Sequence, residues 1–385
     1  MTTTHAPSLD QLEQLIASQV APAASRVDRD GTFPDASIRA LADAGFLGLL
    51  SATDVGGAGQ GLRQAASVVE RLAGACGSTA MVLLMHYAAV SVLEAVGPRE
   101  VRAAIANGKH LSTLAFSESG SRSHFWAPLS SATRVDGNGE VQLDANKSWV
   151  TAAAHADSYV WSSRPLAADG PMTLWLVPRS TSGLSAPAGF DGLGLRGNGS
   201  TPITGAAVRV PVSAMLGADG AGLDLALAHV LPTFNVLNAA FSLGVMEAVT
   251  AEAAAHLQAT HLQHLDGASL AQQQSVRLDY ARMRLETDRT QALLEDTLAA
   301  LETQRADGML RVLESKAAAA EAALGVTDLA MKVCGGAAFR RELGIERRFR
   351  DARAARVMAP TTDTLLDFIG RATLGLPLLE GAIAR

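Results

Sequence analysis

The spacing of apolar residues changes twice along the chain. From residue 8 to about residue 112, apolar side chains recur every three or four positions, which predicts helices separated by glycine-rich loops. Between about residues 113 and 212 the spacing falls to two, as at Val141 and Leu143, in short runs bounded by Gly, Pro, Asp and Ser. From about residue 222 onward the helical spacing returns.

These changes predict three domains. We expect a helical domain at residues 1–112, a β domain at 113–221 and a helical bundle at 222–385, so the fold class is mostly α with a middle β domain. In the bundle, one long helix is expected at 273–302, and a second ends at Gly335–Gly336, a pair suited to a helix C-cap. Because cofactors often bind where such layers meet, the pattern alone predicts a helical enzyme or binding protein with a β insert.

Composition and charge exclude several classes of partner. The 385 residues are 48% hydrophobic and 18% charged, and the net charge of −6 comes from interspersed acidic and basic side chains. No basic block indicates nucleic acid, no apolar run approaches the roughly 20 residues that span a membrane, and the N-terminus has no signal-peptide pattern. Cys76 and Cys334 lie far apart without metal-ligand spacing, so we expect no metal site and a reduced, cytoplasmic protein.

Four segments, spread over most of the chain, resemble the acyl-CoA dehydrogenase family. They are Gly45–His86, Leu114–Pro128, Leu143–Val160 and Met331–Leu365. The resemblance implies an N-terminal helical domain, a β-barrel-like middle domain and a C-terminal four-helix bundle, with FAD between the last two. It also implies a homodimer or homotetramer, although the family's residues that contact the FAD of a neighbouring subunit are replaced here by Thr260, Gln263 and His264.

The second segment corresponds to a flavin-contacting strand and loop of the family. Its residues LAFSESGSRS align with a Thr-Glu-Pro-Gly-type motif followed by Ser, so that Ser117, Glu118, Gly120 and Ser123 match. In the family, the backbone and hydroxyl groups of this segment bond the flavin pyrimidine, and the later Ser lies near the thioester substrate. The resemblance therefore implies cofactor contacts for Phe116, Ser117 and Ser123.

The third segment, LDANKSWVTAAAHADSYV, resembles the family's strand with Trp-Ile-Thr. Trp149 and Thr151 match that motif. In the family, the Trp packs on the isoalloxazine ring and the Thr bonds flavin N5, and a flavin needs a flat apolar wall and a few donors of this kind. Trp149 alone would be explained as a buried strand aromatic, but its neighbours make flavin contact the better interpretation.

The fourth segment matches the family's C-terminal signature without a gap. Gly335 and Gly336 are expected to allow close approach of the dinucleotide backbone at a helix end, and Thr361 is expected to contact the cofactor. The charged residues of this segment are better explained as structural ion pairs than as catalysts; they are Glu346, Arg347, Arg350 and Asp351.

One residue of that signature is missing. The family removes the α-proton of an acyl thioester with a Glu and passes the β-hydride to flavin N5, and the position of that Glu is Ala359 here, followed by Pro360. An alternative position used by some branches falls near Phe234, beside Asn235. A missing general base costs about 10²–10⁴ in rate. Ala359 keeps its main-chain N–H, which in the family polarises the thioester carbonyl.

Three residues are candidates for a replacement base. Asp363 lies four residues beyond Ala359, one helical turn away, and could face the same site, although a solvated or N-cap-like Asp is the simpler explanation. His86, on an apolar helix, could point into the substrate cleft, although a core histidine with satisfied hydrogen bonds is more common. Glu247, just after the first turns of the bundle, is expected at the surface.

The leading interpretation is an FAD-dependent oxidoreductase that acts on an acyl thioester, on CoA or on a carrier protein. It would perform α,β-dehydrogenation or a variant of it without a protein base. The alternative is a flavin-dependent monooxygenase on the same fold, which uses reduced flavin and oxygen. A third interpretation is a non-catalytic flavin- or acyl-binding protein. The expected electron partner is an electron-transfer flavoprotein or a flavin reductase.

Overall fold

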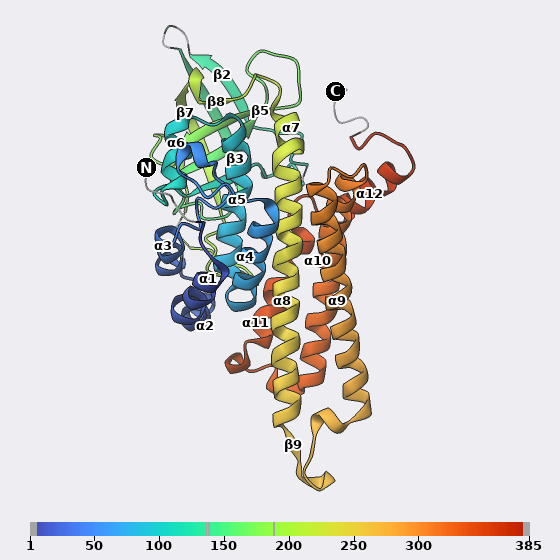
Figure 1. The fold of residues 1–385 in the computed structure, drawn as a ribbon. Helices are drawn as coiled ribbons and strands as arrows, with labels where there is room; N and C mark the ends of the chain where they lie inside the picture. Colours follow the sequence, from blue (N-terminus) through green and yellow to red (C-terminus); the bar gives the residue numbers. More distant parts are fainter. Residues whose placement is uncertain (1–5, 123, 136, 138, 188, 380–385) are drawn as a thin grey trace.

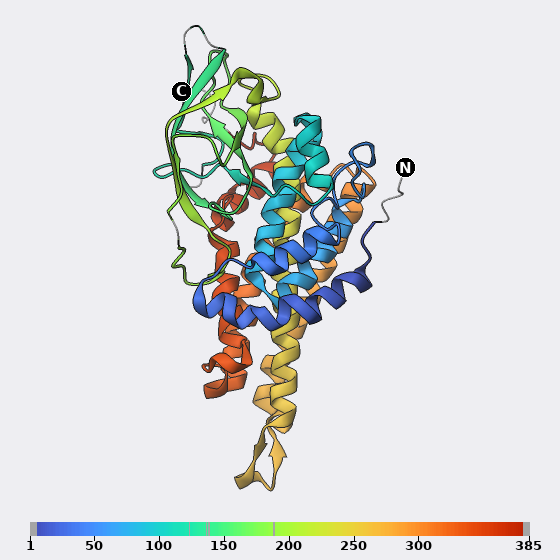
Figure 2. The ribbon, with the colours of Figure 1, turned by 90° about the vertical axis from the view of Figure 1, so that its left-hand side faces the viewer.

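Helices, a β domain and a long helical bundle follow one another along the chain, as Figure 1 shows from blue to red. The computed structural model describes residues 6–122, 124–135, 137, 139–187 and 189–379. The N-terminal helices and the β domain lie along one side of the bundle, and the bundle extends well beyond them at one end (Figures 1 and 2). This arrangement confirms the predicted fold class.

The N-terminal domain is built of helices around one central helix, α5. Its helices are α1 (Leu9–Leu15), α2 (Ala21–Asp30), α3 (Asp35–Asp43), α4 (Leu62–Ala75), α5 (Gly77–Val96) and α6 (Arg99–Ala106). A π-helical turn at Ile16–Val20 joins α1 to α2, and a 3-10 turn forms at Thr53–Val55. Nearly every residue of α5 is buried, because the helix is apolar on all sides and packs against α4, α8 and β1.

The β domain consists of two four-stranded sheets rather than the barrel-like domain that the resemblance implied. One sheet has the order β1-β4-β5-β8 and the other β2-β3-β7-β6, and no strand pairing closes them into a barrel among the described residues. The strands are β1 (Ser112–Ala115), β2 (Ser131–Val135), β3 (Glu140–Val150), β4 (Ser158–Ser163), β5 (Thr173–Pro178), β6 (Leu184–Ser185), β7 (Thr201–Pro211) and β8 (Met215–Leu216). In β3, Val141, Leu143 and Ala145 are buried as their alternation predicts.

The C-terminal domain is a bundle of long helices that lie side by side (Figure 1). Its helices are α7 (Gly222–Leu225), α8 (Leu231–Ala259), α9 (Gln274–Glu302), α10 (Gly308–Cys334), α11 (Ile345–Val357) and α12 (Thr362–Thr373). A π-helical turn at Ala226–Val230 precedes α8, and a small hairpin of β9 (His261–Leu262) and β10 (Ala268–Ser269) joins α8 to α9. Short 3-10 turns form at Val212–Ala214, Gln263–Leu265, Leu270–Gln272, Gly335–Ala337 and Arg341–Leu343.

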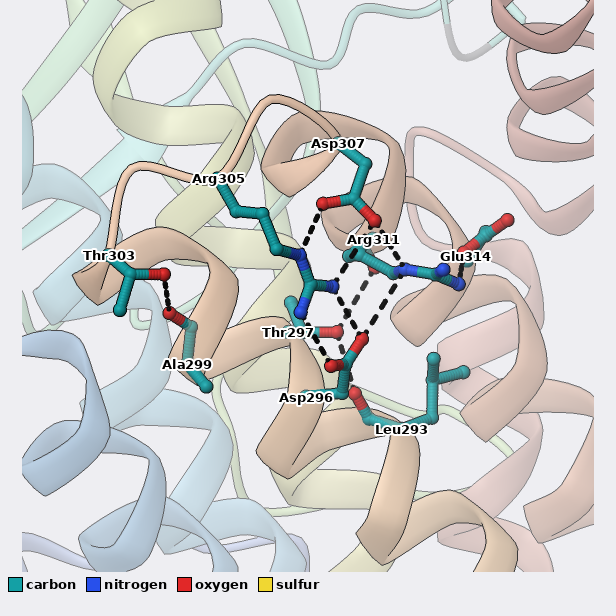
Figure 3. A network of polar contacts seen from close by, with 9 residues as sticks. All are labelled: Leu293, Asp296, Thr297, Ala299, Thr303, Arg305, Asp307, Arg311 and Glu314. Carbon is teal, nitrogen blue, oxygen red and sulfur yellow. Dashed lines mark hydrogen bonds and ion pairs between the residues drawn. The ribbon is translucent and has the colours of Figure 1, made fainter.

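An ion-pair network fixes the turn between α9 and α10 (Figure 3). Arg305 donates to both carboxylate oxygens of Asp296, at 2.8 and 2.7 Å. Asp307 accepts from Arg305 at 2.5 Å and from Arg311 at 3.1 Å, and Arg311 also donates to Glu314 at 2.8 Å. Because bidentate arginine–carboxylate pairs constrain geometry as well as distance, this network defines where α10 begins.

Within the part of the chain that the structure describes, two helical stretches are long and apolar enough to cross a membrane by length and composition alone. They are α5 and residues 222–259, and both are mostly buried inside the protein. Core helices of folded domains have the same character, so these stretches are weak evidence for a membrane span.

Candidate functional site

A cavity of about 730 Å³ lies where the three domains meet. Its wall takes Met85 from α5, the segment that follows β1, the end of β3, a loop at residues 190–200, the first turns of α8 and the turn that follows α11. This volume is within the range of roughly 300–1,000 Å³ that is typical of ligand pockets. Most of the exposed area of the wall is apolar, so the cavity suits a flat or apolar ligand.

Trp149 is the most unusual residue of this wall. Its side chain is 69% exposed although it is a large aromatic, and its ring meets the edge of Phe190 at 6.2 Å between centroids. Its φ of 55° lies in the left-handed region, within a register irregularity between Lys147 and Val150 of β3. Strained positions of this kind concentrate at functional sites. Trp149 is therefore not the buried strand aromatic that its residue type alone would suggest.

A buried ion pair holds the segment after β1 against β3. Lys147 Nζ lies 2.5 Å from a carboxylate oxygen of Glu118 and 2.7 Å from the Ser162 carbonyl oxygen. The other Glu118 oxygen accepts from the main-chain N–H groups of Leu129 and Ser130. Burial lowers the pKa of Lys147 to about 8 despite its partner. Burial raises the pKa of Glu118, but the ammonium and the donors lower it more, so it stays below its usual value.

The loop at residues 190–200 is held by two consecutive residues of α11. Arg350 donates to the Leu193 carbonyl at 3.1 Å and makes a bidentate pair with Asp28 of α2, at 2.8 and 2.6 Å. Asp351 accepts from the Leu195 N–H at 2.6 Å, and burial raises the pKa of its carboxyl to about 6. Arg350 also pairs with Glu346 at 2.7 Å, which confirms its predicted structural role. These contacts join all three domains around the cavity.

The turn after α11 brings Ala359 to the cavity wall. Met358, Ala359 and Pro360 all line the cavity, and the Ala359–Pro360 bond is cis. Within the described residues, the Ala359 N–H has no hydrogen-bond partner. Behind the turn, the buried Lys316 of α10 donates to the carbonyls of Met358 and Pro360, at 3.0 and 2.7 Å.

The charged residues of the wall include no free carboxylate in the part of the chain that the structure describes. Glu118 is the wall's carboxylate, and both its oxygens are occupied within the protein. Arg350 and Arg353 line the wall and are paired, the latter with Asp328. Arg122 lines the wall without a partner among the described residues. The wall can therefore hold an anion, but its described residues include no carboxylate that is free to act as a general base.

Five of the residues expected at the site line this cavity. They are Phe116, Ser117, Trp149, Thr151 and Ala359. Thr151 is buried, and its hydroxyl lies 3.0 Å from the Ser200 hydroxyl. Their contacts with a flavin stay predictions, but the structure brings together residues that are up to 243 positions apart, from Phe116 to Ala359. Ser123 lies outside the described residues.

His86, a candidate base, does not point into the cavity, and the alternative explanation of a core histidine fits the structure. Successive residues of a helix point about 100° apart, and in α5 the preceding Met85 takes the cavity face. His86 is fully buried, its Nδ1 accepts from the Ser112 N–H at 3.1 Å, and its Nε2 lies 3.1 Å from the Leu47 carbonyl. Burial lowers its pKa to about 4. It is a core histidine with both ring nitrogens satisfied.

Asp363 does not face the site either. It is exposed in the first turn of α12, where its negative charge interacts favourably with the helix dipole. It does not line the cavity. Thr361 is the N-cap of the same helix, with its hydroxyl accepting from the Thr364 N–H. Glu247 is half-buried rather than at the surface, and together with burial it raises the pKa of Glu70 to about 7.

Gly335 and Gly336 also lie away from this cavity. Gly335 is the C-cap of α10 with φ 56°, as predicted, and both residues are exposed. Because α10 runs antiparallel to α9, its end lies toward the hairpin end of the bundle (Figure 1). Neither residue lines the cavity, and a contact of this pair with a dinucleotide stays a prediction.

Some residues of the site were not anticipated. Phe190 and Leu193 come from a loop whose sequence carries only turn signals, and the approach of Phe190 to Trp149 depends on tertiary contacts. Lys147 and Lys316 are fully buried lysines. Lys316 is followed by four alanines in ESKAAAAEAAL, and a lysine beside such an apolar helical run was the available signal.

Family models match almost the whole chain. The acyl-CoA dehydrogenase N-terminal domain matches residues 2–108, the middle domain 113–208 and the C-terminal domain 220–374. The mitochondrial short-chain specific acyl-CoA dehydrogenase of Bos taurus is 26% identical over 370 residues, which cover 94% of this chain and 87% of that protein.

Solved structures show the same fold. Butyryl-CoA dehydrogenase from Megasphaera elsdenii has a TM-score of 0.88 at 21% identity, covering 95% of this chain and 97% of that one. A chain from a structure described as an electron transferring flavoprotein of Acidaminococcus fermentans also reaches 0.88, at 20% identity and with 95% and 96% covered. With matching models in all three domains, the chain belongs to the acyl-CoA dehydrogenase family of flavoprotein oxidoreductases.

Proposed function

We propose that the protein binds FAD in the cavity and acts on an acyl thioester whose carbonyl faces Ala359. The observation that carries this proposal is that an exposed Trp149 and an Ala359 N–H unpaired among the described residues line one cavity. A flat aromatic surface suits the isoalloxazine ring, and the Ser117 and Thr151 hydroxyls beside it suit the polar edge of the flavin. The residues present therefore fit the cofactor.

The chain's own residues would orient and activate the substrate. Bound FAD supplies a two-electron acceptor. Leu231, Phe234 and Met358 give the wall an apolar surface that excludes water from the acyl group. The Ala359 N–H donates to the thioester carbonyl oxygen, which acidifies the α-carbon. A basic group of the substrate itself then has to accept the α-proton, because the described wall has no free carboxylate and excludes water.

That missing carboxylate also favours a second candidate. A flavin monooxygenase on this fold needs the cavity, the aromatic wall and a water-excluding surface, but no base for an α-proton. The paired state of Glu118 and the exposed position of Asp363 both support this alternative. Its electron partner would be a flavin reductase, whereas the first candidate would use an electron-transfer flavoprotein.

One anaerobic titration separates the two candidates. The FAD-loaded protein is mixed with a panel of acyl-CoAs that differ in chain length and branching, and the flavin absorbance is followed. Bleaching by at least one acyl-CoA supports the dehydrogenase. No bleaching, combined with a fast reaction of the chemically reduced protein with oxygen, supports the monooxygenase.

We also propose a cytoplasmic location, in keeping with two buried, unpaired cysteines, and a homodimer or homotetramer.

A further inference from the structure

A buried lysine stands directly behind the cavity wall at Ala359. Lys316 Nζ lies 3.1 Å from the Ala355 carbonyl oxygen, 3.0 Å from that of Met358 and 2.7 Å from that of Pro360. The side chain is fully buried, and no carboxylate within the described residues pairs with it. An ammonium group has three N–H donors, so each donor here has one acceptor.

These three carbonyls favour the charged form of the lysine. Burial alone lowers the pKa of Lys316 to about 7. A neutral amine, however, has two N–H donors and would turn its lone pair toward one of the three oxygens. Ala355 lies in the last turn of α11, where unpaired carbonyls gather and the helix dipole attracts a cation. Lys316 thus caps α11 and fixes the turn that follows it.

That turn forms part of the cavity surface. Met358 and Pro360, whose carbonyls Lys316 binds, flank Ala359, whose N–H is unpaired among the described residues. Asn238 Nδ2 lies 3.8 Å from Met358 Sδ, so α8 supports the turn from another side. The Lys316 ammonium also lies 5.8 Å from the ring centre of Phe234, which lines the cavity.

We propose that Lys316 is a positioning residue that holds the 358–360 turn so that the Ala359 N–H meets the ligand's carbonyl oxygen, while its charge favours negative charge on that oxygen. The inference rests on the proposed function. A fixed N–H and a nearby cation both stabilise an oxyanion in a site from which water is excluded. Because residue 359 carries no carboxylate, nothing at this position neutralises the ammonium, and the wall favours an enolate over a neutral thioester.

Acetoacetyl-CoA is a suitable probe, because its enolate is a stable anion with its own ultraviolet absorption. Binding to the FAD-loaded protein is measured by calorimetry, and the pH at which the bound probe enolises is read from difference spectra. The variants are Lys316→Met, which lacks charge and donors, and Lys316→Gln, which keeps two donors without the charge. Lys332→Met, an exposed lysine on the same helix, is the matched control.

We expect the wild type to lower the enolisation pH of the bound probe and Lys332→Met to behave in the same way. Both Lys316 variants should raise that pH. Lys316→Met should also weaken binding of the probe by about tenfold or more, because the Ala359 N–H loses its hydrogen bond to the charged enolate oxygen. If Lys316→Met does not fold, Lys316→Gln decides. If a folded Lys316 variant enolises the probe at the same pH as the wild type, the positioning role is overturned and the proposed function stands. If the wild type does not bind the probe, both the proposed function and the positioning role are overturned.

Discussion

At the scale of single residues, Ala359 determines what chemistry the cavity can perform. If the cavity is a dehydrogenase site that lacks only its general base, Ala359→Glu should supply that base. We expect acyl-CoA-dependent flavin reduction to rise by about 10²–10⁴, the usual contribution of a general base. Stopped-flow absorbance under anaerobic conditions measures this rate.

The control for this variant is Ala359→Gln, which has nearly the same size without a base. It should leave the rate at the wild-type level. Equal rates for the Glu and Gln variants, with acyl-CoA still bound, would show that the rest of the site is not arranged for α-proton removal. That result would favour the monooxygenase.

Trp149 carries the predicted contact with the flavin ring. Because its side chain is 69% exposed in the protein alone, Trp149→Ala should change thermal stability little but weaken FAD binding by about 1–3 kcal/mol. Trp149→Phe keeps an aromatic wall and should retain most of the affinity. Flavin fluorescence titration measures the FAD affinity of both variants. Unchanged FAD affinity in Trp149→Ala would show that the isoalloxazine ring does not bind against Trp149.

At the scale of structural elements, the Lys147–Glu118 pair joins β3 to the segment after β1. Glu118→Gln leaves a buried ammonium without a counter-charge, and we expect it to cost about 3–5 kcal/mol in the free energy of unfolding. Urea unfolding measures this loss. The double variant Glu118→Gln/Lys147→Met should recover part of the lost stability. A Glu118→Gln variant as stable as the wild type would contradict a structural role for the Lys147–Glu118 pair.

His86 joins α5 to β1 and to the Leu47 loop, and it should make stability depend on pH. The pKa of His86 in the folded protein is about 4, below the ordinary value of 6.5. Between these two pH values the ring is protonated in the unfolded chain but neutral in the folded protein. Stability from this group is complete above pH 6.5 and falls by about 3 kcal/mol as the pH drops toward 4.

The comparison that isolates this effect is with His86→Leu. Other groups, such as Asp351 and Glu70, titrate in both proteins and cancel in the difference. The stability gap between the two proteins should narrow as the pH falls from 6.5 to 4 in chemical unfolding experiments. A gap that stays constant over this range would show that the ring is not kept neutral.

Periodicity predicted the longer helices and strands, but not which of their faces meet. The alternation in β3 predicted its buried side, and the Gly335–Gly336 pair predicted where α10 ends. The direction of His86 could not be predicted, because α5 is apolar all round and its hydrophobic pattern does not say which face meets the cavity. The open sheets likewise depend on long-range strand pairing that local patterns do not contain.

At the scale of the whole molecule, the site exists only because three domains meet. Arg350 connects α2, α11 and the loop at Leu193, and no single domain supplies the whole cavity wall. The resemblance of the motifs brought Phe116, Trp149 and Ala359 together, and all three line the cavity, whereas Gly335, Gly336 and Thr361 do not. It could not predict Lys316, whose role depends on how α10 packs behind the turn.

The central claim is that the isoalloxazine ring lies between Trp149 and the turn at Ala359. A crystal structure of the protein with FAD tests it most directly. We expect ring density against the Trp149 indole, with the Ala359 N–H facing the open space beside the ring. FAD bound at another surface, or a cavity that stays empty in crystals grown with excess FAD, would contradict the account.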